Sequence, residues 1–98
     1  MIPLSVVAFL IICQPLRAEK NSANSVCKVT DPTGTPLNVR VSPNGKIVNT
    51  LRNGREVYIQ RTANDDRGRN WVYVSGYYDG AYRNWGWVFR EFISCYDR

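Results

Sequence analysis

Residues 71–96, which read WVYVSGYYDGAYRNWGWVFREFISCY, decide the fold of this chain. This stretch holds all three tryptophans, five of the six tyrosines and two of the three phenylalanines. Within it, residues 71–74 and 85–89 are rich in aromatic and β-branched side chains, and they flank a polar, tyrosine-rich connection. That arrangement is typical of a β-hairpin. Because aromatic side chains bury the most area per residue, we expect this hairpin to nucleate the core.

Shorter β-prone runs precede and follow the hairpin. We expect strands at 26–30, 37–40, 47–51, 56–61 and 93–96, turns at 31–36, 42–45 and 53–54, a charged loop at 63–70 and one helical turn at 90–92. No stretch has the period of an α-helix. The sequence therefore predicts an all-β fold, a small barrel of five to seven short antiparallel strands.

Alternation along the strands predicts which side chains enter the core. The expected inward positions are Leu37, Val39, Val57, Ile59, Val72, Val74, Val88 and Phe92. On the second arm of the hairpin, Trp85, Trp87 and Phe89 are expected to share the opposite face, which then points at least partly outward. We expect Arg40 or another arginine to stack on these rings, and an uncovered ring face would be a binding surface.

The chain begins with a segment that resembles a secretory signal. Residues 2–12 are almost wholly apolar, and a plausible cleavage site follows Ala18. The apolar run is too short to span a bilayer comfortably, so a retained anchor is the weaker alternative. We therefore expect a signal peptide at 1–18, a flexible leader at 19–25 and a domain at 26–98. The protein would then be periplasmic or secreted.

A domain of this size is marginally stable without a covalent link. Signal cleavage would remove Cys13 and leave Cys27 and Cys95, for which only one pairing exists. Export makes this disulfide possible. The pairing of Cys27 with Cys95 predicts that the first and last strands are neighbours. Two free, buried thiols are the alternative. The chain has no histidine, so no metal site and no cofactor are expected.

Four motifs, taken in order, match a known pattern. They are Leu37-Asn38-Val39-Arg40 with Pro43, Ile47, Leu51 and Gly54; Val57 and Ile59 with Trp71 and Val74; Gly86-Trp87-Val88; and Phe92-Ile93. Over about residues 26–95 the chain resembles bacterial Src-homology-3 (SH3b) domains. It departs from them at Ser42, where glycine is usual, and in the long connection at 75–84. The resemblance implies a small, partly open barrel that binds cell-wall (peptidoglycan) peptide or an envelope protein.

The sequence offers little for catalysis. Its serines have no base beside them in a recognisable motif. Asp65 and Asp66 could form a metal or acid–base pair, but adjacent carboxylates in a charged loop are far more often a solvated turn. We therefore expect a protein that is not an enzyme; a small wall-active enzyme is the weakest of the readings.

Binding is the better hypothesis, because small barrels bind extended peptides in aromatic-lined grooves and tyrosines offer rigid, amphipathic contacts. The candidate ligand-binding residues are Tyr77, Tyr78, Asp79, Tyr82, Arg83, Trp85, Trp87 and Arg40. The alternative is that these side chains simply cover one end of the barrel.

The net charge of +5 suits an acidic ligand, and export favours cell-wall components over nucleic acid. The expected function is a non-catalytic, exported binding module for cell-wall peptide or an envelope protein. The alternative is a docking or inhibitor domain that acts on an envelope enzyme.

Overall fold

The computed structural model describes residues 25–97, and the expected signal peptide and residues 19–24 of the leader lie outside this range. The described chain forms seven strands and one 3-10 turn: β1 (Ser25–Val29), β2 (Leu37–Arg40), β3 (Ile47–Leu51), β4 (Glu56–Asn64), β5 (Asn70–Tyr78), β6 (Ala81–Phe89), η1 (Arg90–Phe92) and β7 (Ile93–Asp97). Every expected strand is therefore present. The leader was expected to include Ser25, which instead begins β1.

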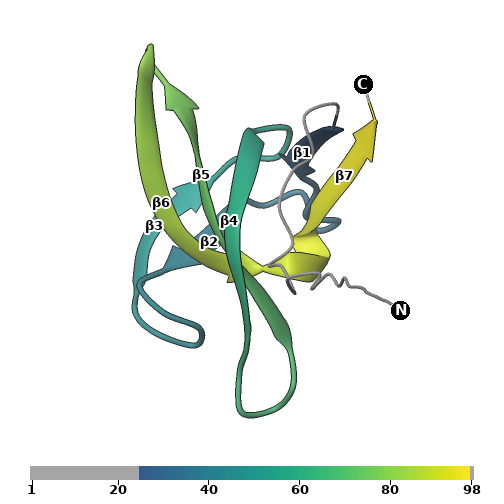
Figure 1. Cartoon of the computed structure of the whole chain (residues 1–98), viewed down its shortest axis with the longest axis vertical. Coiled ribbons are helices and arrows are strands. Elements are labelled where there is room, and N and C mark those ends of the chain that lie inside the picture. The colour runs from purple at the N-terminus through teal and green to yellow at the C-terminus, as the bar shows by residue number, and fades with distance from the viewer. Residues whose placement is uncertain (1–24, 98) are drawn as a thin grey trace, which may run out of the picture.

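The strands form one antiparallel sheet in the order β3-β2-β6-β5-β4-β1-β7, which curls into a half-barrel (Figure 1). The prediction of an all-β, barrel-like fold is thus confirmed. Strands β3 and β7 are the two edges of the sheet. Strand β2 joins the β2–β3 hairpin to the rest of the sheet through β6, where Arg40 lies opposite Trp87.

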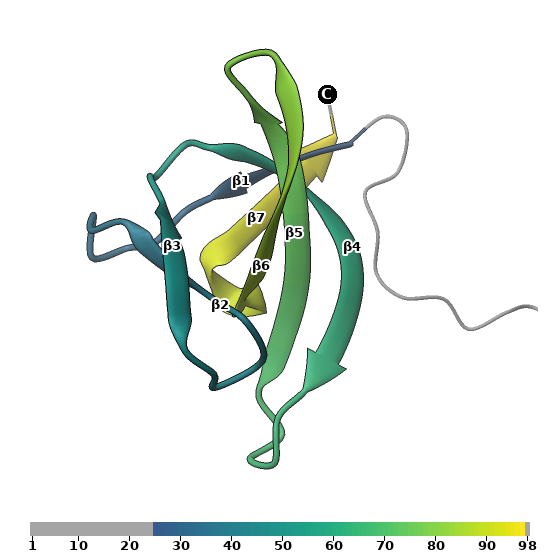
Figure 2. The same ribbon diagram turned by 90° about the vertical axis from the view of Figure 1, so that its left-hand side faces the viewer.

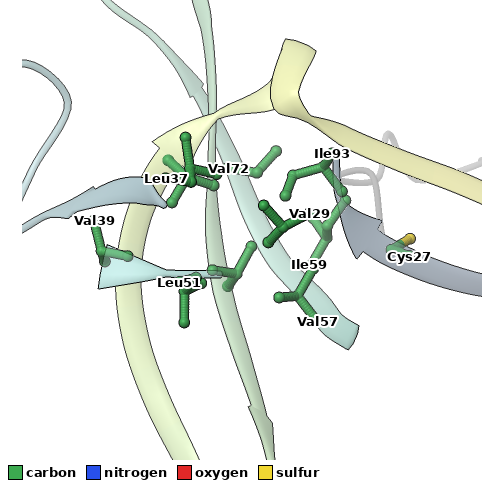
Figure 3. Close-up of a cluster of buried hydrophobic side chains, with 11 residues drawn as sticks. Cys27, Val29, Leu37, Val39, Leu51, Val57, Ile59, Val72 and Ile93 are labelled. Carbon is green, nitrogen blue, oxygen red and sulfur yellow. The ribbon is translucent and has the colours of Figure 1, made fainter. Parts of the chain in front are cut away.

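Apolar side chains on the inner face of the curled sheet form the core (Figure 3). Its members are Cys27, Val29, Leu37, Val39, Leu51, Val57, Ile59, Val72, Val74, Val88 and Ile93, with Trp85 and Phe92 packed against them. Most are β-branched, which suits a pleated and half-buried surface. Seven of the eight predicted inward residues are in this cluster and the eighth, Phe92, is partly buried against it, so that prediction is confirmed.

The predicted disulfide is present and joins the first and last strands. Cys27 and Cys95 are direct partners in the register of β1 with β7, and their sulfurs are bonded. The prediction that these strands are neighbours is confirmed as well. Because the two cysteines are 68 positions apart, the bond closes almost the whole domain into one loop. The chain-entropy model gives about 4 kcal/mol of stabilisation for a loop of this length.

The expected long connection at 75–84 is wrong. Strand β5 continues to Tyr78 and β6 begins at Ala81, so only Asp79 and Gly80 turn the chain. Both have positive φ, 57° and 77°, which is the conformation of the hairpin turn that Asp-Gly favours. The hairpin therefore extends beyond the neighbouring strands, at the end of the molecule where β3 passes into β4 (Figure 2).

The prediction that Trp85 and Trp87 share a face is also wrong. Val74 pairs with Gly86 and Ser75 pairs with Asn84, so Trp85 is an extra, bulged residue of β6. A bulge shifts the alternation of side chains. As a result Trp85 packs against the core cluster, while Trp87 lies beside Tyr73 on the outer face.

The outer face is covered by rings and arginines, as expected. The Arg61 guanidinium lies 5.3 Å from the centre of the Trp87 ring and 4.8 Å from that of Tyr73. Trp71 is 1% exposed, because the Phe89 ring lies over it with 4.0 Å between centroids. Arg40 itself takes no part in this cover; its Nη1 donates a hydrogen bond to the carbonyl of Gly45.

Candidate functional site

A groove of about 650 Å³ lies between β3 and the extended β5–β6 hairpin. It is lined by Pro36, Asn49, Thr50, Leu51, Arg52, Arg55, Tyr78, Arg83, Asn84 and Trp85. Arg52 and Arg55 flank the turn that leads from β3 into β4, and Arg83 projects from the hairpin opposite them. Three of the lining residues are arginines and none is acidic, so the groove carries a positive potential.

Stacking on aromatic rings orders two of these arginines. The Arg55 guanidinium lies 5.1 Å from the centroid of the Tyr78 ring and 6.0 Å from that of Trp85. The Arg83 guanidinium lies 5.6 Å from the same Tyr78 ring. Tyr78 thus contacts two cations, and its ring is held beside them. Cation–π contacts of this kind restrict long side chains without consuming their N–H donors.

The three groove arginines have no ion pair with any residue in the described range 25–97. The Nε atom of Arg55 is buried and has no hydrogen-bond partner among the same residues. Buried donors without partners are uncommon in native proteins, and each calls for an explanation. The groove therefore combines oriented cationic side chains with exposed ring surface.

Trp85 takes its position because β5 has a glycine beneath it. A Cβ atom at Gly76 would lie 2.6 Å and 2.7 Å from atoms Cζ3 and Cη2 of the Trp85 indole. Only a residue without a side chain leaves room for the indole to lie against the strand. Trp85 is half-buried as a result, with one part on the core and another lining the groove.

A second aromatic group lies on the outer face of the hairpin. Tyr77 and Tyr82 meet with 5.1 Å between ring centroids, and Tyr58 contacts both rings. The Tyr82 hydroxyl is hydrogen-bonded to Ser75 Oγ, and Gln60 Nε2 donates to both oxygens, at 2.9 Å to Ser75 and 2.8 Å to Tyr82. These bonds hold the Tyr82 ring along the sheet, whereas Tyr77 is 59% exposed.

The eight residues predicted to bind ligand are therefore not one site. Tyr78, Arg83 and Trp85 line the groove. The other five lie elsewhere: Tyr77 and Tyr82 in the outer tyrosine group, Asp79 in the hairpin turn, Trp87 under Arg61, and Arg40 bonded to Gly45. Sequence reasoning missed Arg52, Arg55 and Pro36. Their positions beside a predicted turn and a predicted loop gave no signal that they face the hairpin.

The sequence suggested that Asp65 lies in a solvated turn, and for this side chain that prediction is wrong. Its side chain is 2% exposed, and its carboxylate accepts hydrogen bonds from the Arg69 guanidinium, Trp71 Nε1, Asn44 Nδ2 and the amides of Arg67 and Arg69. Removal of this carboxylate from water would raise its pKa. The hydrogen bonds from Trp71, Arg69 and Arg67 outweigh that effect and hold the pKa well below its usual value. Asp65 therefore joins two loops to the sheet.

No helix in the described part of the chain is long and apolar enough to cross a membrane. Residues 25–97 also contain no group of three or more His, Cys, Asp or Glu side chains placed to hold a metal ion. Comparisons of the chain with protein-family models, with curated proteins and with solved structures give no match.

Proposed function

We propose that this chain is a non-catalytic, exported binding module of the SH3b type, and that it recognises cell-wall peptide of the bacterial envelope in the groove between β3 and the β5–β6 hairpin. The observation that carries the proposal is the lining of that groove, where the rings of Tyr78 and Trp85 lie beside three arginines without an ion pair in the described range. Aromatic-lined grooves on small barrels suit extended peptides. The motifs that resemble SH3b domains supply the ligand class.

Two further observations support this proposal. The Cys27–Cys95 disulfide fits an oxidising compartment, which the expected signal peptide would reach. Of the adjacent carboxylates Asp65 and Asp66, Asp65 accepts five hydrogen bonds within the fold. A carboxylate so engaged is poorly suited to exchange protons near neutral pH.

The second candidate function is a docking or inhibitor domain that acts on an envelope enzyme. The extended hairpin favours it, because its tip carries exposed tyrosines on both faces. Tyr77 and Tyr82 lie on the outer face, and Tyr78 lies on the groove side, each about half exposed. Tyrosines in such positions are enriched at protein interfaces, where they contribute contact area at low entropic cost.

Sedimentation with purified insoluble cell wall tests the proposal. We expect the protein to sediment with the wall, and the variants Tyr78→Ala and Trp85→Ala to remain in the supernatant. Tyr96→Ala is the matched control, because Tyr96 is 48% exposed on β7, at the edge of the sheet away from the groove. Wall binding that is equal in all four proteins would refute the site. The second function would be favoured if the protein does not bind cell wall but retains an envelope protein, and if that retention is lost in Tyr77→Ala.

A further inference from the structure

We infer that the groove recognises its ligand through oxyanion groups, carboxylate or phosphate, seated between Arg52 and Arg55 on one side and Arg83 on the other. This inference rests on the proposed function and names the ligand chemistry of the same site. The groove offers three guanidinium groups and no acidic side chain in its lining. A neutral or cationic ligand would leave that charge uncompensated.

The arginines are free to bind an external anion. In the described range 25–97 none of the three makes an ion pair, although the same range contains one for Arg69, with Asp65. An arginine can use its donors on oxygen atoms within the fold, as Arg40 does with the carbonyl of Gly45. Among residues 25–97, the side chains of the three groove arginines donate no such hydrogen bond. A planar guanidinium presents its donors in a fork that matches the two oxygens of a carboxylate or phosphate.

Stacking also orders the cations before a ligand arrives. Arg55 and Arg83 both lie against the Tyr78 ring, at 5.1 Å and 5.6 Å from its centroid. Their guanidinium groups therefore lose less conformational freedom on binding than free arginine side chains would. Restricted cations with unused donors are a pre-organised anion site.

The rings restrict what the rest of the ligand can be. Trp85, Tyr78, Leu51 and Pro36 supply apolar surface in the same groove. A small inorganic anion would contact the arginines but leave that surface wet. The site therefore favours a chain in which anionic groups alternate with apolar or flat groups, over a single ion. An acidic peptide meets this description, because one chain can carry both carboxylates and apolar side chains.

Titration of the purified protein with defined probes tests the inference, with intrinsic tryptophan fluorescence as the readout because Trp85 lies in the groove. The probes are tetra-glutamate, sodium tripolyphosphate and, as the neutral control, tetra-glutamine. We expect the two anions to bind and the neutral peptide not to bind. The stronger of the two anions shows whether the arginines prefer carboxylate or phosphate oxygens. Affinity should fall steeply between about 50 and 500 mM salt, because exposed charges are screened over that range.

Arginine variants separate site binding from net charge. The double variant Arg52→Gln/Arg83→Gln removes two groove charges, and Lys46→Gln/Arg67→Gln removes two exposed charges from other loops. We expect about a tenfold weaker affinity per groove arginine, since each loses a charge-assisted hydrogen bond, and less than about a twofold change in the control. Equal losses in both pairs, or tetra-glutamine binding as tightly as tetra-glutamate, would overturn the inference.

The outcomes also distinguish this inference from the proposed function. Wall binding that survives Arg52→Gln/Arg83→Gln at high salt but is lost in Trp85→Ala refutes the anion site and leaves the binding module in place. If the probes bind through the arginines but the native protein does not bind cell wall, the wall ligand is refuted and the anion site remains in place.

Discussion

The substitution Gly76→Ala tests whether the groove is built as described. The new Cβ atom would lie 2.6 Å and 2.7 Å from two indole carbons of Trp85, and 3.1 Å from the carbonyl oxygen of Glu56. Carbon atoms do not approach so closely, so the indole must move out of its place against β5. Because Trp85 contacts both the core and the groove, we expect the variant to lose stability and ligand affinity together.

The magnitude follows from two opposing terms. Overpacking of a well-packed site costs about 1–3 kcal/mol. Alanine in place of glycine restricts the unfolded chain and returns about 0.4–1 kcal/mol. The net loss of unfolding free energy should be roughly 1–2 kcal/mol. In a domain of this size that corresponds to a fall in Tm of roughly 5–15 °C.

A double-mutant cycle identifies the cause. Trp85→Phe removes both indole carbons that approach Gly76, so the cost of Gly76→Ala should be smaller in the Trp85→Phe background, by about 1 kcal/mol. The contact with the Glu56 carbonyl remains, so the rescue should be incomplete. Urea denaturation followed by far-UV circular dichroism gives each unfolding free energy. If the costs of the two substitutions add within about 0.5 kcal/mol, Trp85 does not rest on Gly76 and the account of the groove fails.

Three further predictions concern the stability of the fold. Reduction of the Cys27–Cys95 disulfide should lower the unfolding free energy by about 4 kcal/mol, measured by urea denaturation with and without reductant; an unchanged midpoint would contradict this. The pKa of Asp65 is lowered by folding, so its stabilising effect is fully present above the ordinary value of 3.8 and is lost as pH falls below it. Thermal unfolding between about pH 5 and 2 should therefore show a smaller acid loss for Asp65→Asn than for the native chain, and equal pH slopes would exclude this role. Tyr82→Phe should lower the unfolding free energy by about 1 kcal/mol, because Ser75 Oγ loses a hydrogen bond. Tyr77→Phe should not change it measurably, because the Tyr77 hydroxyl has no partner among the described residues. Equal effects of the two substitutions in urea denaturation would place the stabilisation in the rings.

Local patterns predicted the framework well because each of them acts over a few residues. Alternation placed Leu37 and Val39 inward, and the same rule worked for Val57 and Ile59, since none of these strands changes face within the predicted range. The disulfide followed from a count of cysteines and not from distance. These inferences required no knowledge of which strands are neighbours.

The predictions failed where one residue or one distant pairing changed the geometry. Asp79-Gly80 is the strongest short hairpin signal, yet the tyrosines around it made the segment look like a loop. Gly86 inside a strand was a signal for a bulge, and the bulge at Trp85 moved that ring to the core face. No local signal places Arg52 and Arg55 opposite Arg83, because that arrangement depends on the pairing of β2 with β6.

Two glycines allow two different close contacts of the β5–β6 hairpin. A Cβ atom at Gly86, whose φ is 142°, would lie 2.8 Å from the carbonyl oxygen of Arg40, so this glycine allows β6 to approach β2. Gly76 instead accommodates the ring of Trp85, which the bulge beside Gly86 directs inward. A side chain at Gly86 would therefore strain the pairing through which β2 joins β6, and with it the whole half-barrel. A side chain at Gly76 would instead displace Trp85, which packs against the core and forms one wall of the groove. Without Trp85 in place, the arginines and the Tyr78 ring would still line the groove.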